Sequence, residues 1–187
     1  QAGGLLRYGI PDFKLEKSVI DRRINLMKES GIEFRVETEV GKDISFYELK
    51  AYDAVVLATG STVPWHMQLP GHEAKGIHFA MDFLKQQNKE VSGISIDGER
   101  ILATDKHVVI IGDGDTGSDC IGTSNRHRAK SITQIARKPT PAKERLKNNP
   151  WPMDKVTFGT SSSQEEGCER LWATETQGFV HDENGHI

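Results

Sequence analysis

The stretch that decides the fold is His107-Val-Val-Ile-Ile-Gly-Asp-Gly-Asp-Thr-Gly-Ser-Asp-Cys120, an apolar run followed by three spaced glycines. The run of four β-branched residues from Val108 to Ile111 is typical of a parallel strand that is covered on both faces. Glycines then follow at the G-x-G-x-x-G spacing, as Gly112, Gly114 and Gly117. A segment compatible with a helix comes next, so the pattern predicts a strand, a tight turn and a helix.

Each glycine has its own physical role in such a turn. Gly112 lets the chain turn sharply, Gly114 lets the backbone approach a pyrophosphate, and Gly117 lets the helix lie close to the strand. Free amide groups and the positive end of the helix would then face the phosphates. Glycine-rich turns also arise for packing alone, which is the structural alternative. The strand before the turn and the helix after it favour dinucleotide binding.

The segments after the turn complete one βαβ unit, with a helix expected over 115–126 and a second parallel strand over 131–136. This second strand ends in Ala136-Arg137-Lys138. An acidic residue at this position binds the ribose 2′-hydroxyl of NAD, whereas a basic one accommodates the 2′-phosphate of NADP. The sequence therefore favours NADPH, with Arg137 and Lys138 as its ligands. The alternative is that both are ordinary solvated charges at the end of a strand.

The remaining segments are expected to alternate between helices, strands and loops. Hydrophobic periodicity predicts helices over 15–30 and around 45–50, and strands over 32–40 and 52–60, the latter closing in Ala-Thr-Gly. A short strand from Gly76 should enter a helix that runs to about Asn88, and 179–187 should form a strand, a turn and the start of a second strand. Residues 1–14, 89–106 and 139–152 should be loops or linkers.

Composition limits the classes of function. The chain has 187 residues, 36% of them hydrophobic, which suits one compact domain or parts of two. Its 24 basic and 27 acidic residues are mixed, so no nucleic-acid partner is expected, and no apolar stretch approaches the roughly 18 residues of a membrane span. Cys120 and Cys168 fit a reducing, cytoplasmic compartment better than a disulfide framework. The seven histidines lack metal-ligand spacing and no nucleophilic triad is evident, so neither a metal site nor a catalytic side chain is expected.

Six stretches that cover nearly the whole chain carry a family pattern: Gly4-Leu-Leu-Arg-Tyr-Gly-Ile-Pro11 with Phe13-Lys-Leu-Glu-Lys17, Ala54-Val-Val-Leu-Ala-Thr-Gly60, Gly76-Ile-His-Phe-Ala-Met-Asp-Phe-Leu84, Gly114-Asp-Thr-Gly-Ser-Asp-Cys-Ile-Gly-Thr-Ser-Asn-Arg126, Asn149-Pro-Trp-Pro152 and Asp182-Glu-Asn-Gly185. Together they resemble the small subunit of glutamate synthase, a NADPH-linked flavoprotein related to the flavin domains of dihydropyrimidine dehydrogenase.

The resemblance implies an α/β, Rossmann-like three-layer fold with two interlocked nucleotide-binding domains. Residues 1–98 would be part of an FAD-binding domain, and 101–187 a C-terminally truncated NAD(P)-binding domain. The FAD phosphate-binding glycine motif and upstream iron–sulfur cysteines of such proteins are not found in the sequence. We therefore expect a fragment that does not retain FAD and is inactive alone.

The resemblance also implies the chemistry and the partners. Electrons would pass from NADPH through FAD to a large subunit that makes glutamate from glutamine and 2-oxoglutarate, with iron–sulfur clusters and FMN elsewhere in the complex. Another electron acceptor, or a non-catalytic nucleotide-binding module, are the alternatives. The expected cofactor-binding residues are Gly112, Gly114, Asp115, Thr116, Gly117, Arg137 and Lys138 for NADPH, and Arg7, Tyr8, Gly9, Ile10, Pro11, Ala58, Thr59 and Gly60 for FAD.

Three positions depart from this resemblance. Asp113 stands where relatives carry glycine or alanine, and its carboxylate would repel a pyrophosphate unless it points away. Arg128 replaces a glycine at the end of a helix, where a left-handed residue costs about 1 kcal/mol. Many relatives carry glutamate where this chain has Ala136, so cofactor preference cannot simply be carried over.

Overall fold

The computed structural model describes residues 1–61 and 63–187. Its centre is a parallel three-stranded sheet in the order β1 (His107–Ile111), β2 (Ser131–Ile135) and β3 (Glu169–Leu171). The register pairs Ile110 with Gln134, and Gln134 with Arg170. The expected α/β class and the adjacent, parallel strands near 107–111 and 131–136 are confirmed. The third strand lies in a polar segment whose residue pattern does not predict a strand.

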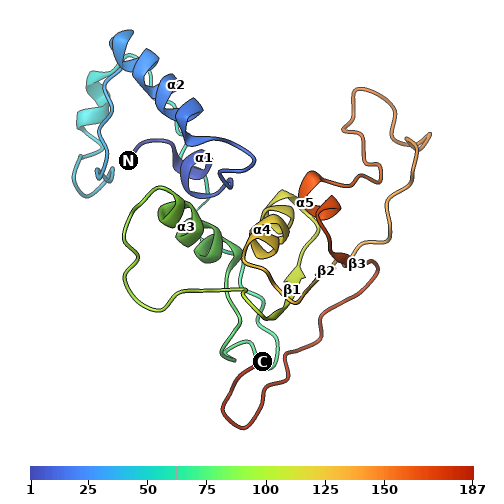
Figure 1. Cartoon of the computed structure of the whole chain (residues 1–187). Coiled ribbons are helices and arrows are strands. Elements are labelled where there is room, and N and C mark those ends of the chain that lie inside the picture. The colour runs from blue at the N-terminus through green and yellow to red at the C-terminus, as the bar shows by residue number, and fades with distance from the viewer. Residues whose placement is uncertain (62) are drawn as a thin grey trace.

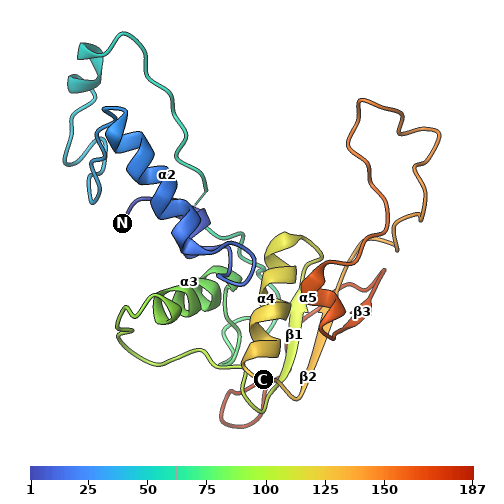
Figure 2. The same ribbon diagram turned by 45° about the horizontal axis from the view of Figure 1, so that its top comes forward.

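Helices cover one face of this sheet. Helix α4 (Asp115–Arg126) lies along β1 and β2, and the four-residue α5 (Ser162–Glu165) packs beside it (Figures 1 and 2). On β1, Ile110 is buried whereas Val109 is 59% exposed and Ile111 42% exposed. The expectation that β1 is covered on both faces is therefore wrong. A β-branched run specifies a strand, but the layers that cover it come from other parts of a chain.

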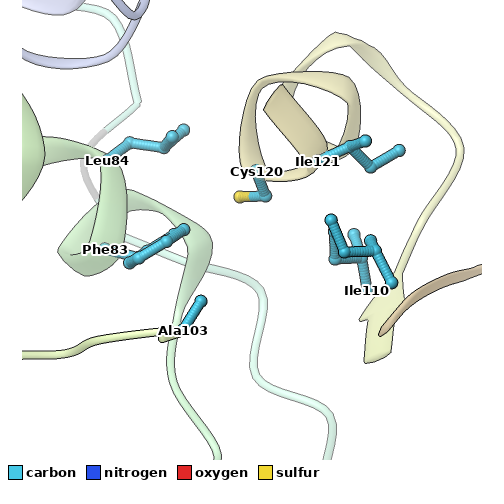
Figure 3. Close-up of a cluster of buried hydrophobic side chains, with 7 residues drawn as sticks. Phe83, Leu84, Ala103, Ile110, Cys120 and Ile121 are labelled. Atoms are coloured by element: carbon cyan, nitrogen blue, oxygen red, sulfur yellow. The ribbon is translucent and has the colours of Figure 1, made fainter. Parts of the chain in front are cut away.

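The core joins the βαβ unit to α3 (Ala80–Val91), which packs across α4. Figure 3 shows Phe83 and Leu84 pointing from α3 toward α4, where Cys120 faces them, while Ile121 points to the Ile110 side of the same core. Leu84 is 1% exposed and Ile121 fully buried. Because this core connects residues on both sides of position 98, the division into domains at 98–101 stays a prediction.

The N-terminal segment forms two helices, of which only the first contacts α3. The short α1 (Gly4–Tyr8) contacts α3, and α2 (Lys17–Glu29) contacts α1 (Figure 1). The prediction of a helix over 15–30 is confirmed, whereas the prediction that 1–14 is only a loop is wrong at α1. Glycine and proline suggested a loop, but Leu5, Leu6 and Arg7 are strong helix formers. The helix expected around 45–50 is the 3₁₀ turn η1 (Glu48–Ala51).

Three expected strands do not form. Residues 32–40 are irregular apart from a single bridge between Val40 and Ile44, 52–60 has no strand, and 76–79 leads into α3 without one. The two strands expected over 179–187 are absent as well, although Gly185 closes a turn on Asp182 and His186 forms one bridge with Lys75. An alternating or apolar pattern describes how a strand would pair, but it supplies no neighbouring strand to satisfy the backbone.

Candidate functional site

The glycine turn lies at the carboxyl end of β1, between that strand and α4. Gly112 has φ 127°, a left-handed value that favours glycine, and its N–H donates to the carbonyl of Ile135 at 2.9 Å. The turn is therefore fastened to the carboxyl end of β2 as well. In open parallel sheets this edge is where ligands bind.

The first turn of α4 leaves backbone donors without protein partners. Gly114 is the N-cap residue and provides no side chain to cap the helix. Across the described ranges 1–61 and 63–187, no acceptor meets the backbone N–H of Gly114, Asp115 or Thr116. A Cβ placed on Gly114 would find no atom within 4 Å. Uncapped donors beside open space can accept an anionic ligand.

Gly117 is the point of closest approach between α4 and the turn. A Cβ on this residue would lie 2.6 Å from the carbonyl oxygen of Gly112 and 3.1 Å from the Gln134 side chain. Any side chain would push the helix away from β1. The spacing of the three glycines thus matches three different local requirements: a left-handed turn, an open approach and a close contact.

The end of β2 presents two basic residues. Arg137 and Lys138 are exposed, and within the part of the chain that the structure describes neither forms an ion pair. Ala136 is 3% exposed, and its N–H donates to Leu171 on β3. The cations are thus available at the same sheet edge as the glycine turn.

Two carboxylates share this edge. Asp113 and Asp115 are both exposed, the first in the turn and the second in the first turn of α4. Exposure screens their repulsion of an anion, because water and salt weaken surface charges strongly.

The segment Arg7–Pro11 lies on α3, away from the glycine turn. Asn88 of α3 donates to the carbonyl of Gly9, and Arg7 is buried with its guanidinium 2.5 Å from Asp21. Lys17 holds the end of the segment through the carbonyl of Ile10 at 2.5 Å, and burial lowers the pKa of Lys17. These contacts give the segment one fixed shape. Arg7, Tyr8, Gly9, Ile10 and Pro11 remain predicted FAD ligands.

Among the described residues, 58–60 form no hydrogen bond with the glycine turn or with the Arg7–Pro11 segment. All three are exposed, and none hydrogen-bonds to another residue that the structure describes. Their role toward FAD therefore stays a prediction.

A polar network behind the turn was missed from the sequence. Gln134 of β2 donates to the carbonyl of Gly112 at 2.8 Å and accepts from Gln164 at 2.8 Å. Farther along, Lys14 donates to Ser118 of α4 at 2.9 Å and pairs with Asp119 at 2.8 Å. The signal was present in β2, where Gln134 occupies a core-facing position between buried Ile132 and Ala136. A polar residue in a buried register needs a specific partner.

The remaining hollows, cysteines and histidines of residues 1–61 and 63–187 do not assemble a second site. Two shallow hollows lie at the opposite end of α4, around His127 and around Cys168, far from the strand ends that carry the turn. Burial raises the pKa of the Cys120 thiol to about 12 and also raises the pKa of Cys168, so neither is a thiolate at neutral pH. Among the residues described, no three metal-ligating side chains cluster, and no helix is long and apolar enough to cross a membrane.

A comparison with known protein families identifies the family to which the chain belongs. The family model described as pyridine nucleotide-disulphide oxidoreductase matches residues 47–149, a range that holds β1, the glycine turn, α4 and β2. The chain belongs to this pyridine nucleotide-disulphide oxidoreductase family. Members of the family bind FAD and NAD(P) in general.

Individual relatives of this oxidoreductase are glutamate synthases. The chain is 47% identical to "Glutamate synthase [NADH]" of Schizosaccharomyces pombe over 99% of its length, 45% identical to "Glutamate synthase [NADPH] small chain" of Mycobacterium tuberculosis over 95%, and 39% identical to the Bacillus subtilis protein of the same name over 100%. It spans 9%, 38% and 40% of these relatives. The resemblance to glutamate synthase small subunits is confirmed, and the name "small chain" implies a larger partner for those relatives.

Proposed function

We propose that the chain is the nucleotide-binding part of a glutamate synthase small subunit, which passes electrons from NADPH through FAD to a large subunit that makes glutamate from glutamine and 2-oxoglutarate. The observation that carries the proposal is the uncapped N-terminus of α4 at Gly114, beside open space and exposed cations. The identity with glutamate synthases over nearly the whole chain supports the choice of reaction.

The residues of the turn fit a dinucleotide. The N–H groups of Gly114, Asp115 and Thr116 would hold the pyrophosphate, while Gly112 and Gly117 keep the strand and the helix in the geometry that aims them. Hydride transfer is chemistry that the nicotinamide and the flavin supply when bound, and the protein provides orientation and electrostatics. Because the cofactors supply the chemistry, we assign no side chain as a catalytic acid or base.

We propose that FAD is bound by a longer protein, one with the length of the bacterial relatives. Arg7 is already paired with Asp21, and Ala58–Gly60 have no hydrogen bonds to other described residues, so the chain alone offers FAD few ready ligands. Near-stoichiometric flavin absorbance in the purified chain would contradict this part. Iron–sulfur clusters and FMN would lie elsewhere in the complex, and the free thiols of Cys120 and Cys168 suit a cytoplasmic setting.

For the dinucleotide we propose NADPH over NADH. Arg137 is exposed and unpaired among the described side chains, so its guanidinium can reach a 2′-phosphate, whereas Ala136 offers no carboxylate to a ribose hydroxyl. Arg137→Ala should weaken NADPH binding about 10-fold to 100-fold and leave NADH unchanged. Calorimetric titration of both nucleotides into both proteins tests this choice. An equal loss for the two nucleotides would reduce Arg137 and Lys138 to solvated charges.

The reaction is tested with the intact protein and its large partner. Formation of glutamate from glutamine and 2-oxoglutarate, driven by NADPH, is the expected result. NADPH oxidation with an artificial acceptor but no glutamate would favour a related oxidoreductase with another acceptor. Nucleotide binding without any oxidation would favour a non-catalytic nucleotide-binding module.

A further inference from the structure

Gln134 is held in one orientation behind the glycine turn. Its side chain is 1% exposed, its amide nitrogen donates to the carbonyl of Gly112 at 2.8 Å, and its amide oxygen accepts from Gln164 at 2.8 Å. Because one end meets an acceptor and the other a donor, reversing the amide would break both hydrogen bonds. The carboxamide therefore acts as a fixed brace between the turn and α5.

The contact with Gly112 governs the peptide that begins the turn. Gly112 has φ 127°, and its carbonyl oxygen is so close to Gly117 that a methyl group there would lie 2.6 Å away. The carbonyl is thus confined between α4 and the Gln134 amide. Since a peptide is planar, fixing this carbonyl also fixes the N–H of Asp113 and the path into Gly114.

The far end of the brace is itself supported. Gln164 accepts from the N–H of Ser161 at 2.8 Å while its own N–H donates to the Ser161 hydroxyl, a reciprocal cap on α5. The Ser161 hydroxyl also lies 2.6 Å from that of Ser118 on α4, which accepts from Lys14. A continuous chain of hydrogen bonds thus leads from the turn to the N-terminal segment. Such networks rigidify when every member is satisfied.

We propose that Gln134 is a positioning residue for the dinucleotide: it sets the Gly112 peptide, and through it the direction of the N–H donors that hold the pyrophosphate. The inference rests on the proposed function, because it needs a dinucleotide at the turn. Gln134 touches no phosphate itself. It contributes by keeping the donors aimed before the ligand arrives.

The chain contains a matched control for this residue. Gln86 on α3 is also buried, donates to the carbonyl of Ile101 at 2.9 Å and accepts from the N–H of Ile101 at 2.7 Å. It makes the same kind of brace but lies away from the turn. Loss of either carboxamide leaves partly buried backbone groups unpaired, so both losses should lower stability comparably.

The experiment compares Gln134→Met with Gln86→Met in the 187-residue chain. NADP⁺ is titrated by calorimetry at a temperature where circular dichroism reports both variants folded. Gln134→Met should raise the NADP⁺ Kd about 10-fold, whereas Gln86→Met should leave it within about twofold of wild type despite a similar drop in Tm. Equal Kd values for wild type and Gln134→Met would overturn the inference.

Gln134→Glu provides a second arm that does not depend on the methionine variant folding. A protonated carboxyl group has one donor and one acceptor, the same pattern as the amide, whereas the carboxylate can only accept and would face the Gly112 carbonyl. The ratio of its NADP⁺ Kd to that of wild type should therefore approach 1 at acid pH and rise as the pH is raised. Titration of the NADP⁺ phosphate affects both proteins and cancels in the ratio.

The outcomes separate the two proposals. Binding by wild type with a ratio for Gln134→Glu that does not change with pH would overturn the positioning role alone. If the wild-type chain binds no NADP⁺, the proposed function fails for this chain, and the role of Gln134 fails with it.

Discussion

Two stretches of this chain have similar sequence patterns, but only one of them forms a strand. Val108–Gly112 and Val55–Gly60 are both apolar runs that end at a glycine with positive φ, 127° at Gly112 and 69° at Gly60. The first is β1, paired along its length with β2. The second has no strand, with Val56 86% exposed and Leu57 82% exposed. A strand pattern becomes a strand only where the same chain supplies the neighbour.

The largest expected difference lies in side-chain burial. Ile121 is fully buried opposite β1. Ile121→Ala should lower the free energy of unfolding by about 2 to 5 kcal/mol, because the substitution leaves a cavity that the packed surroundings cannot fill. Leu57→Ala, in the exposed run, should change it by less than about 0.5 kcal/mol. Urea denaturation of both variants measures the difference. Similar losses would mean that the 52–60 segment is packed in solution, contrary to the structure.

A smaller difference should separate the glycines. Gly117→Ala places a methyl group 2.6 Å from the Gly112 carbonyl and should cost about 1 to 3 kcal/mol by overpacking. Gly60→Ala meets no atom within 4 Å, so only its left-handed backbone opposes the change, by about 1 kcal/mol at most if the segment cannot relax. Thermal melts of the two variants rank them. A larger loss of stability for Gly60→Ala than for Gly117→Ala would contradict the close contact between α4 and the Gly112 carbonyl.

The smallest effect is a gain. Arg128 follows α4 with φ 59°, as the sequence predicted for this departure from glycine, and its N–H and that of Ala129 close the helix on Asn125 and Ser124. Arg128→Gly should therefore stabilise the chain by about 0.5 to 1 kcal/mol. Glu37, also left-handed at φ 55°, lies in the irregular segment 32–40, so Glu37→Gly should gain less stability in the same denaturation assay.

The sequence predicted the βαβ unit well, and it predicted poorly the segments whose pairing partners are distant or missing. The glycine turn, α2, α4 and the pairing of β1 with β2 follow from local periodicity and spacing, because all their partners lie within about 30 residues. The three residues of β3 carry no strand pattern and pair through backbone alone. The runs at 32–40 and 52–60 carry the pattern without a partner.

The residues of the candidate site also fall into those that the sequence predicts and those that it does not. The turn glycines, Arg137 and Lys138 meet at one edge because parallel strands end together there, which topology alone predicts. The brace through Gln134 and Gln164 could not be derived, since it joins residues 30 apart and the four-residue α5 has no sequence signal beyond its Ser161–Gln164 capping box. Only the polar residue at a core-facing position of β2 indicated that a partner was needed.

Nucleotide binding at the glycine turn is tested by substituting Gly114, because this residue leaves open the space through which a pyrophosphate would reach α4. Gly114→Ala and Gly159→Ala each add a methyl group that meets no atom within 4 Å, and neither glycine has a positive φ. We expect saturable NADP⁺ binding to wild type and to Gly159→Ala, and a Kd raised about 10-fold to 100-fold in Gly114→Ala, with a stability loss under about 1 kcal/mol. The same Kd for Gly114→Ala and Gly159→Ala, or no binding by the wild-type chain, would contradict nucleotide binding at this turn.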